Sequence, residues 1–234
     1  MLANDEIRMI NQVLPRSCRN VRRADRLTNR PGARRGGLRY NAFTLIELVL
    51  VVGIIIVLAG LVLSTVGYAR KKGARARAET EMAAISAAIE NYKADNGIYV
   101  RGPGTAMTVG STAIPANVTD TLNAKANGDP TSAIYGQSSL YLYTQLSGDL
   151  TGNQQATGKT YFAFKPQMLS TDSNGVVTAI KDPFGTSYGY STANQVDPTQ
   201  GYNPTFDLWS TAGLTANPPP SGTDSITPQW LKNW

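Results

Sequence analysis

Histidine is absent from the 234-residue sequence, and cysteine occurs once, at Cys18. The absence of histidine excludes Ser-His-Asp and Cys-His nucleophilic sites, histidine-ligated zinc and a histidine general base. A single cysteine forms no intrachain disulfide and gives no indication of the redox compartment. Carboxylate pairs and lysine bases remain available, but no catalytic constellation is visible. We therefore predict that the protein is not an enzyme.

Acidic residues are scarce in the first 42 positions, which hold ten arginines against three acidic residues and carry a net charge of +7. Residues 43–234 carry only −1. Segment 1–42 shows no apolar periodicity and is predicted to be a disordered leader, with Met1 or Met9 as its start. Basic residues beside a membrane span are retained on the cytoplasmic side. We favour that role over a nucleic-acid-binding arm and expect no nucleic-acid partner.

Charge is also scarce between Phe43 and Ala69, where the only ionised side chain is Glu47. These 27 positions would form about 40 Å of helix, which exceeds the roughly 30 Å hydrocarbon core of a bilayer. No small-x-small cleavage site precedes the basic stretch that begins at Ala69, so an ordinary secretory signal does not fit. Residues 43–69 are predicted to be a transmembrane helix.

A helical pattern continues without a break over residues 70–97. Four apolar residues lie at helical spacing and form one stripe: Met82, Ile85, Ile89 and Tyr92. The Asn96-Gly97 pair supplies the left-handed residue that commonly ends a helix. The glycines at 53, 60, 67 and 73 would soften the helix or allow another helix to approach closely.

Residues 98–234 are predicted to form a small globular domain. Segment 101–136 has few large apolar side chains and is expected to be a long loop. A short helix should precede Gly148, because Leu140, Tyr143 and Leu146 have helical spacing.

The rest of this domain favours strands, because its apolar pattern changes to a period of two. Strands are expected at residues 159–165, 176–180, around 188 and at 206–210. The terminal Trp230, Leu231 and Trp234 should dock on the domain. The predicted fold class is α+β, with the long helix packed on a small C-terminal antiparallel sheet.

The segment AFTLIELVLVVGIIIVLAG, residues 42–60, resembles the N-terminal signature of type IV pilins and type II secretion pseudopilins. The resemblance implies that a prepilin peptidase cuts between Ala42 and Phe43. Phe43 would become a methylated N-terminus, and Glu47 would act in assembly. The sequence departs from the signature at Ala42, where glycine is usual.

Three further stretches resemble the major pseudopilin of type II secretion: IENYKADNGIYV, DPFGTSYGY and FDLWSTAG. The resemblance implies a pilin-like fold and a periplasmic filament built as a homopolymer through the N-terminal helix. Its partners would be an inner-membrane assembly platform and minor pseudopilins. The protein would cross the bacterial inner membrane once, with its N-terminus cytoplasmic and its C-terminal domain periplasmic.

Calcium binds in the loop that follows the third stretch in that family. Here the corresponding loop contains one acidic residue, Asp224. Calcium prefers six to eight oxygen ligands, several of them carboxylates. We therefore expect no metal site and no cofactor.

Alternatives remain open for Glu47 and for the function. Glu47 would either snorkel at the membrane edge or pair with the freed amine of Phe43 in a neighbouring subunit, and the FTLIEL context favours pairing. The chain would otherwise serve a type IV pilus, for adhesion, motility or DNA uptake, or act as a membrane-anchored binding module that does not polymerise. Such a module would display aromatic residues, which we interpret instead as core: Tyr141, Tyr143, Tyr161, Phe162, Tyr188, Tyr190 and Trp209. The sequence does not separate a major from a minor subunit.

Overall fold

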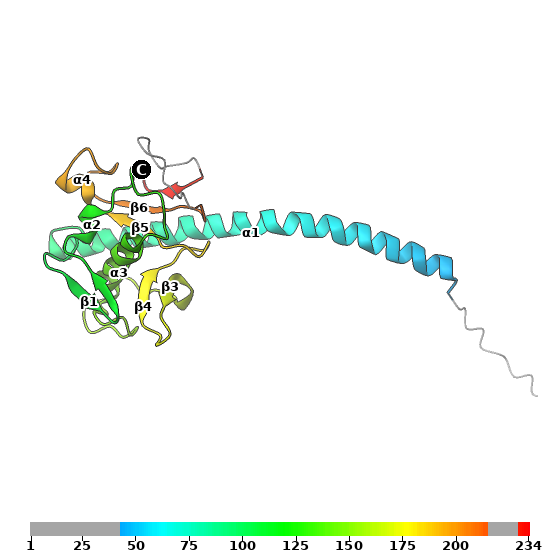
Figure 1. Cartoon of the computed structure of the whole chain (residues 1–234), viewed down its shortest axis with the longest axis horizontal. Helices are drawn as coiled ribbons and strands as arrows, with labels where there is room; N and C mark the ends of the chain where they lie inside the picture. The colour runs from blue at the N-terminus through cyan, green and yellow to red at the C-terminus, as the bar shows by residue number, and fades with distance from the viewer. Residues whose placement is uncertain (1–42, 215–228) are drawn as a thin grey trace, which may run out of the picture. The chain divides into compact units, whose positions relative to one another are not determined.

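The computed structural model describes residues 43–214 and 229–234, which fall into two units divided after Leu50. The leader, Ala42 at its end and Asp224 lie outside the described residues. The architecture is α+β, with one long helix, shorter helices and short antiparallel strands (Figure 1). This confirms the α+β part of the predicted fold class, while the pilin-like fold stays a prediction.

Helix α1, Leu45–Asn96, contains both the apolar segment and the amphipathic segment. The predicted continuous helix is therefore confirmed, although it begins two residues after Phe43. Its end is also as predicted, because Gly97 has a φ of 77° and its N–H bonds to the Lys93 carbonyl at 2.7 Å. Glycine adopts this left-handed conformation without the steric penalty of a Cβ.

The amphipathic half of α1 contributes the predicted stripe to the main hydrophobic core. Met82, Ile85 and Ile89 are buried, and Tyr92 is partly buried against the same cluster. Burying each of the aliphatic side chains is worth about 1.5–3 kcal/mol. Figure 1 shows α3 and the small sheets gathered around this part of the helix. The stripe therefore anchors α1 to the domain.

The expected loop at 101–136 is wrong in part, because it contains a hairpin, a helical turn and the start of a helix. Strands β1, Met107–Val109, and β2, Thr112–Ile114, pair antiparallel around Gly110-Ser111. Gly110 has a φ of 57°, which suits a two-residue hairpin turn. Helix α2, Val118–Thr121, follows, and its Val118 is fully buried.

Helix α3, Ala133–Ser147, is the predicted short helix, extended at its N-terminal end. Gly148 ends it with a φ of 74° and an N–H bond to the Thr144 carbonyl. The helix contacts β2, β4 and β5 and is largely buried. It therefore forms the centre of the domain.

The strand expected at 159–165 is absent, and this prediction is wrong. Phe162 and Phe164 lie partly buried against the core, with ring centroids 4.7 Å apart. These two aromatic residues recur two positions apart because both pack on the domain core. Among the described residues, no strand pairs with this segment. A 3-10 turn, Pro166–Met168, follows, and the strand that forms is β3, Leu169–Thr171.

The remaining strands form two sheets, so the expected single sheet is also corrected. β3 pairs with β4, Val177–Ile180, across the turn that follows Thr171. A three-stranded sheet has the order β5-β6-β7, all antiparallel. The strands of this second sheet and the helix between them are β5, Gly189–Ser191; α4, Ala193–Val196; β6, Asp207–Ser210; and β7, Leu231–Lys232. With β1–β2, the described residues form three small sheets.

The C-terminus docks on the domain as predicted. Trp230 and Leu231 are buried, and Leu231 pairs with Ser210 of β6. Trp230 and the partly buried Trp234 belong to a second cluster around Trp209. Aromatic side chains dominate this cluster because each buries a large apolar area.

A buried carboxylate, Asp149, organises the loop after α3. It accepts hydrogen bonds from the Tyr143 hydroxyl at 2.8 Å and from the backbone N–H groups of Thr151, Gly152 and Gln154 at 2.7–3.0 Å. Burial raises the pKa of the Asp149 carboxyl, but the bonds from Tyr143, Thr151 and Gln154 outweigh it and hold the pKa below its usual value. The carboxylate is therefore the form that the folded loop requires.

Asp149→Ala is expected to lower the free energy of unfolding by about 3 kcal/mol, because buried donors lose their acceptor. At neutral pH, Asp149→Asn should lower the free energy of unfolding by less than Asp149→Ala does. Because the folded pKa is lowered, the carboxylate's contribution is present at neutral pH and is lost as pH falls through that pKa. Urea unfolding followed by tryptophan fluorescence measures the free energy of unfolding of both proteins. The difference in this free energy between wild type and the Asp149→Asn variant should become smaller below about pH 4. A constant difference would contradict this account.

Candidate functional site

The apolar half of α1 exposes its side chains on every side. Leu45, Ile46 and Leu63 are 82, 74 and 74% exposed, and every other described side chain from Leu48 to Val62 is exposed too. Among the described residues, α1 is the one helix long and apolar enough to cross a membrane. A continuous exposed apolar surface of this kind marks a membrane or protein contact.

Nothing among residues 43–214 and 229–234 sterically requires glycine at three positions of this segment. Gly53, Gly60 and Gly67 recur every seven residues, which places them on nearly the same face of α1. A Cβ added at any of them would meet no described atom within 4 Å beyond the adjoining backbone of α1 itself. Small residues on one face let a second helix approach closely. The three positions are thus suited to helix packing that the described residues of this chain do not make.

Glu47 closes a local cap at the start of α1. The Thr44 N–H and the Thr44 hydroxyl each donate to Oε2 of Glu47 at 2.9 Å, and the Glu47 N–H lies 3.4 Å from the Thr44 hydroxyl oxygen. This reciprocal arrangement is a capping box. The capping box is not among the features predicted above, although the Thr-x-x-Glu spacing is a sufficient signal for it.

The cap leaves part of the carboxylate available. Both Thr44 bonds end on Oε2, and within the described residues no hydrogen bond reaches Oε1 of Glu47. Phe43 lies just before the helix and is 84% exposed. The structure thus places Phe43 and Glu47 within one helical turn of each other on exposed surface. Ala42, the other residue of the expected cleavage site, is outside the described residues.

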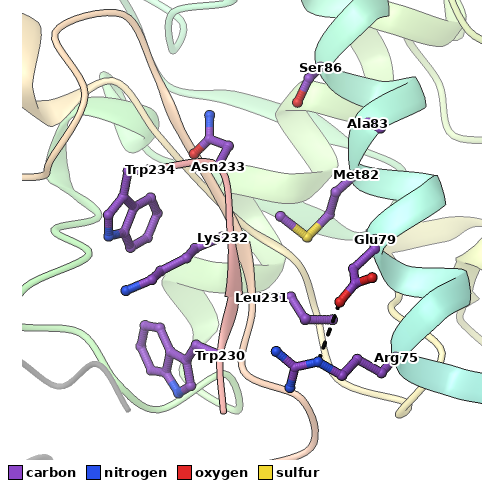
Figure 2. A pocket seen from close by; sticks show the side chains of 10 residues that line it. All are labelled: Arg75, Glu79, Met82, Ala83, Ser86, Trp230, Leu231, Lys232, Asn233 and Trp234. Carbon is purple, nitrogen blue, oxygen red and sulfur yellow. Dashed lines mark ion pairs between the residues drawn. The ribbon is translucent and has the colours of Figure 1, made fainter. Parts of the chain in front are cut away.

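A groove of about 540 Å³ lies between α1 and β7 in the second unit. Figure 2 shows Leu231 directed toward Arg75, Glu79 and Met82 of α1. Arg75 pairs with Glu79 at 3.3 Å and donates to the Gln229 carbonyl at 3.0 Å. The charged groups of the helical wall are thus already paired, and the lining contains no assembled nucleophile and base.

Most of the aromatic residues weighed as a binding face are buried, which confirms their assignment to the core. Tyr141, Tyr143, Tyr188, Tyr190 and Trp209 are at most 8% exposed. Tyr161 and Phe162 are partly buried against the same core. Burial raises the pKa of Tyr141 to about 12, so its hydroxyl stays protonated at neutral pH. The surface required by a binding module is not formed by these side chains.

Among residues 43–214 and 229–234, no group of three or more His, Cys, Asp or Glu side chains is arranged to hold a metal ion. Asp224 lies outside these ranges. No protein-family model matches the sequence, and neither a curated protein nor a solved structure matches it.

Proposed function

We propose that this chain is a structural subunit of a periplasmic pseudopilus that supports type II protein secretion, with a pilin-like fold. Prepilin peptidase removes residues 1–42, the new N-terminus at Phe43 is methylated, and α1 polymerises the mature chain. The assembly platform and minor pseudopilins are its partners. The proposed role involves no catalysis and no cofactor.

The observation that carries the proposal is the exposed apolar half of α1, with Glu47 at the fifth position counted from Phe43. This surface needs an apolar environment, which lipid supplies to the monomer and neighbouring helices supply to a filament. The glycine face at Gly53, Gly60 and Gly67 fits the second environment. One surface therefore serves both states.

The contacts of Glu47 make its pairing role compatible with its capping role. An ionised carboxylate inside a bilayer costs several kcal/mol, and pairing with a cation reduces that cost. Oε2 holds the Thr44 cap, while Oε1 has no partner among the described residues. In a filament, Oε1 accepts a charge-assisted hydrogen bond that the freed amine of a neighbouring subunit's Phe43 donates. The cap thereby holds the carboxylate in place for the second contact.

The charge distribution supports the proposed location. Ten arginines in residues 1–42 favour a cytoplasmic N-terminus, because basic residues are retained on that side of a membrane. The domain formed by residues 98–234 is then periplasmic. A secretin, an assembly ATPase and minor pseudopilins encoded beside this gene would favour secretion over a type IV pilus.

Intact-mass and peptide mass spectrometry of the membrane-purified protein should find an N-terminus at Phe43 that carries one methyl group. Ala42→Gly should be processed at least as completely, because glycine is the usual residue before the cut. Ala42→Leu should retain the leader, because the larger side chain does not fit a position reserved for small residues. A wild-type protein that keeps residues 1–42 in cells containing prepilin peptidase would contradict the proposal.

A further inference from the structure

Three consecutive cations follow the apolar segment of α1 directly: Arg70, Lys71 and Lys72, called here the basic ring. All three are exposed, and none forms an ion pair with any described residue. The next acidic residue along the helix is Glu79. It is too far along the helix for the i+3 or i+4 contact that pairs charges. These positive charges are therefore uncompensated within the described chain.

The cations one to two turns further along α1 do form ion pairs. Arg75 pairs with Glu79 at 3.3 Å, and Arg77 pairs with Glu81 at 2.7 Å. Both are i,i+4 pairs on the helix surface. The contrast locates the unpaired charge at the end of the apolar segment and not along the whole basic stretch.

The basic ring spreads over more than half of the helix circumference and does not follow one face. Successive residues of an α-helix are rotated by about 100°, so residues 70, 71 and 72 point in three well-separated directions. A stripe on one side would suit a protein surface or a nucleic-acid backbone. Charges on several sides at one depth suit a layer of anions that surrounds the helix, which is the arrangement of lipid headgroups.

Tyr68 marks the same level of the helix. It is 65% exposed, and the Lys72 ammonium lies 4.9 Å from the centroid of its ring. Tyrosine is enriched where transmembrane helices meet the headgroup region. An aromatic ring followed at once by cations is therefore expected at the boundary between lipid tails and headgroups.

We propose that the basic ring binds anionic phospholipid headgroups on the side of the membrane where α1 leaves the bilayer. The phosphodiesters supply the negative charge that this part of the helix lacks. The contact fixes the depth of α1 before assembly and must be released when a subunit leaves the membrane. It rests on the membrane anchoring in the proposed function and not on polymerisation.

The test uses the full-length chain inserted in nanodiscs of equal parts phosphatidylcholine and phosphatidylglycerol. Native mass spectrometry then measures which lipid remains bound. Arg70→Gln/Lys71→Gln/Lys72→Gln is expected to reduce the preference for phosphatidylglycerol at least about fivefold, the effect of roughly one surface cation. Lys165→Gln/Lys181→Gln/Lys232→Gln removes the same charge far along the sequence and should leave the preference unchanged. The leader arginines contribute equally to all three proteins.

An unchanged preference in the basic-ring variant would overturn the proposal, as would an equal loss in the control variant. Loss of self-association with an unchanged lipid preference would overturn it in favour of a contact between copies. A preference that disappears at 0.5 M salt would support it, because headgroup attraction is screened. If wild type shows the lipid preference but never forms filaments, the proposed function fails while the basic ring stands.

Discussion

Glu47→Ala is expected to abolish incorporation into filaments while the protein remains folded and inserted in the membrane. The domain core draws on residues from Ala78 onward, so losing a carboxylate at position 47 should not unfold it. Removing the charge lowers the free-energy cost of placing the monomer in lipid. It also leaves the amine of the neighbouring subunit without a partner. The measurement is the yield of sheared filaments beside the amount of membrane-bound subunit. We expect the filament yield to fall at least about a hundredfold, as loss of a buried charge pair worth roughly 3 kcal/mol implies.

Two further variants separate the charge of Glu47 from its capping role. Glu47→Gln keeps an oxygen that accepts from the Thr44 N–H, since glutamine also serves in a capping box, but it removes the charge. Thr44→Ala removes the hydroxyl half of the cap and keeps the charge. If pairing between subunits is the role of Glu47, Gln should fail like Ala and Thr44→Ala should still assemble. The reverse result would show that Glu47 acts only on its own helix.

The long helix could be predicted because its signals are local. An apolar run, an i, i+3, i+7 stripe and a terminal Asn-Gly each depend on neighbours within a few turns. The end at Asn96 and the burial of Ile85 and Ile89 followed directly. The capping box at Thr44 and Glu47 was equally local. It was not predicted because the apolar residues around Glu47 equally fit a carboxylate at a membrane edge or in a pair between subunits.

The sheets could be predicted only in part because the strands are very short. β1, β2, β3 and β5 have three residues each, too few for alternation to stand out. The alternating Phe162 and Phe164 gave a false strand, since burial against a helix produces the same pattern. Which strand pairs with which is decided by tertiary contacts. The periodicity of the sequence therefore could not show that the strands form three sheets and not one.

The residues on which the C-terminal tryptophans pack likewise could not be predicted from the sequence. Docking of Trp230 and Trp234 could be predicted from their size, but not the ring on which they pack. Trp209 of β6 is fully buried, stacks on Trp230 with centroids 6.4 Å apart and donates through its indole N–H to the Tyr135 hydroxyl at 3.1 Å. Gly189 of β5 pairs with it in register. The cluster brings β5, β6, β7 and α3 together.

Trp209→Ala is expected to lower the free energy of unfolding by about 3–5 kcal/mol, a large share of the 5–15 kcal/mol typical of a domain. Gly189→Ala should cost about 1–3 kcal/mol for the opposite reason. A Cβ at residue 189 would lie 2.1 Å from the Trp209 ring, and Tyr135 and Trp230 prevent the ring from moving aside. One change empties the site and the other overfills it.

The double variant decides whether these two effects share one cause. With the Trp209 ring removed, the methyl group at 189 enters vacated space, so Trp209→Ala/Gly189→Ala should cost less than the sum of the single changes by at least about 1 kcal/mol. Urea unfolding followed by fluorescence suits the test because Trp230 and Trp234 remain in the cluster as reporters. Costs that add to within about 0.5 kcal/mol would contradict the contact between Gly189 and Trp209. A coupling of the expected sign would identify glycine at 189 as the residue that lets β5 and β6 pair over a full indole ring.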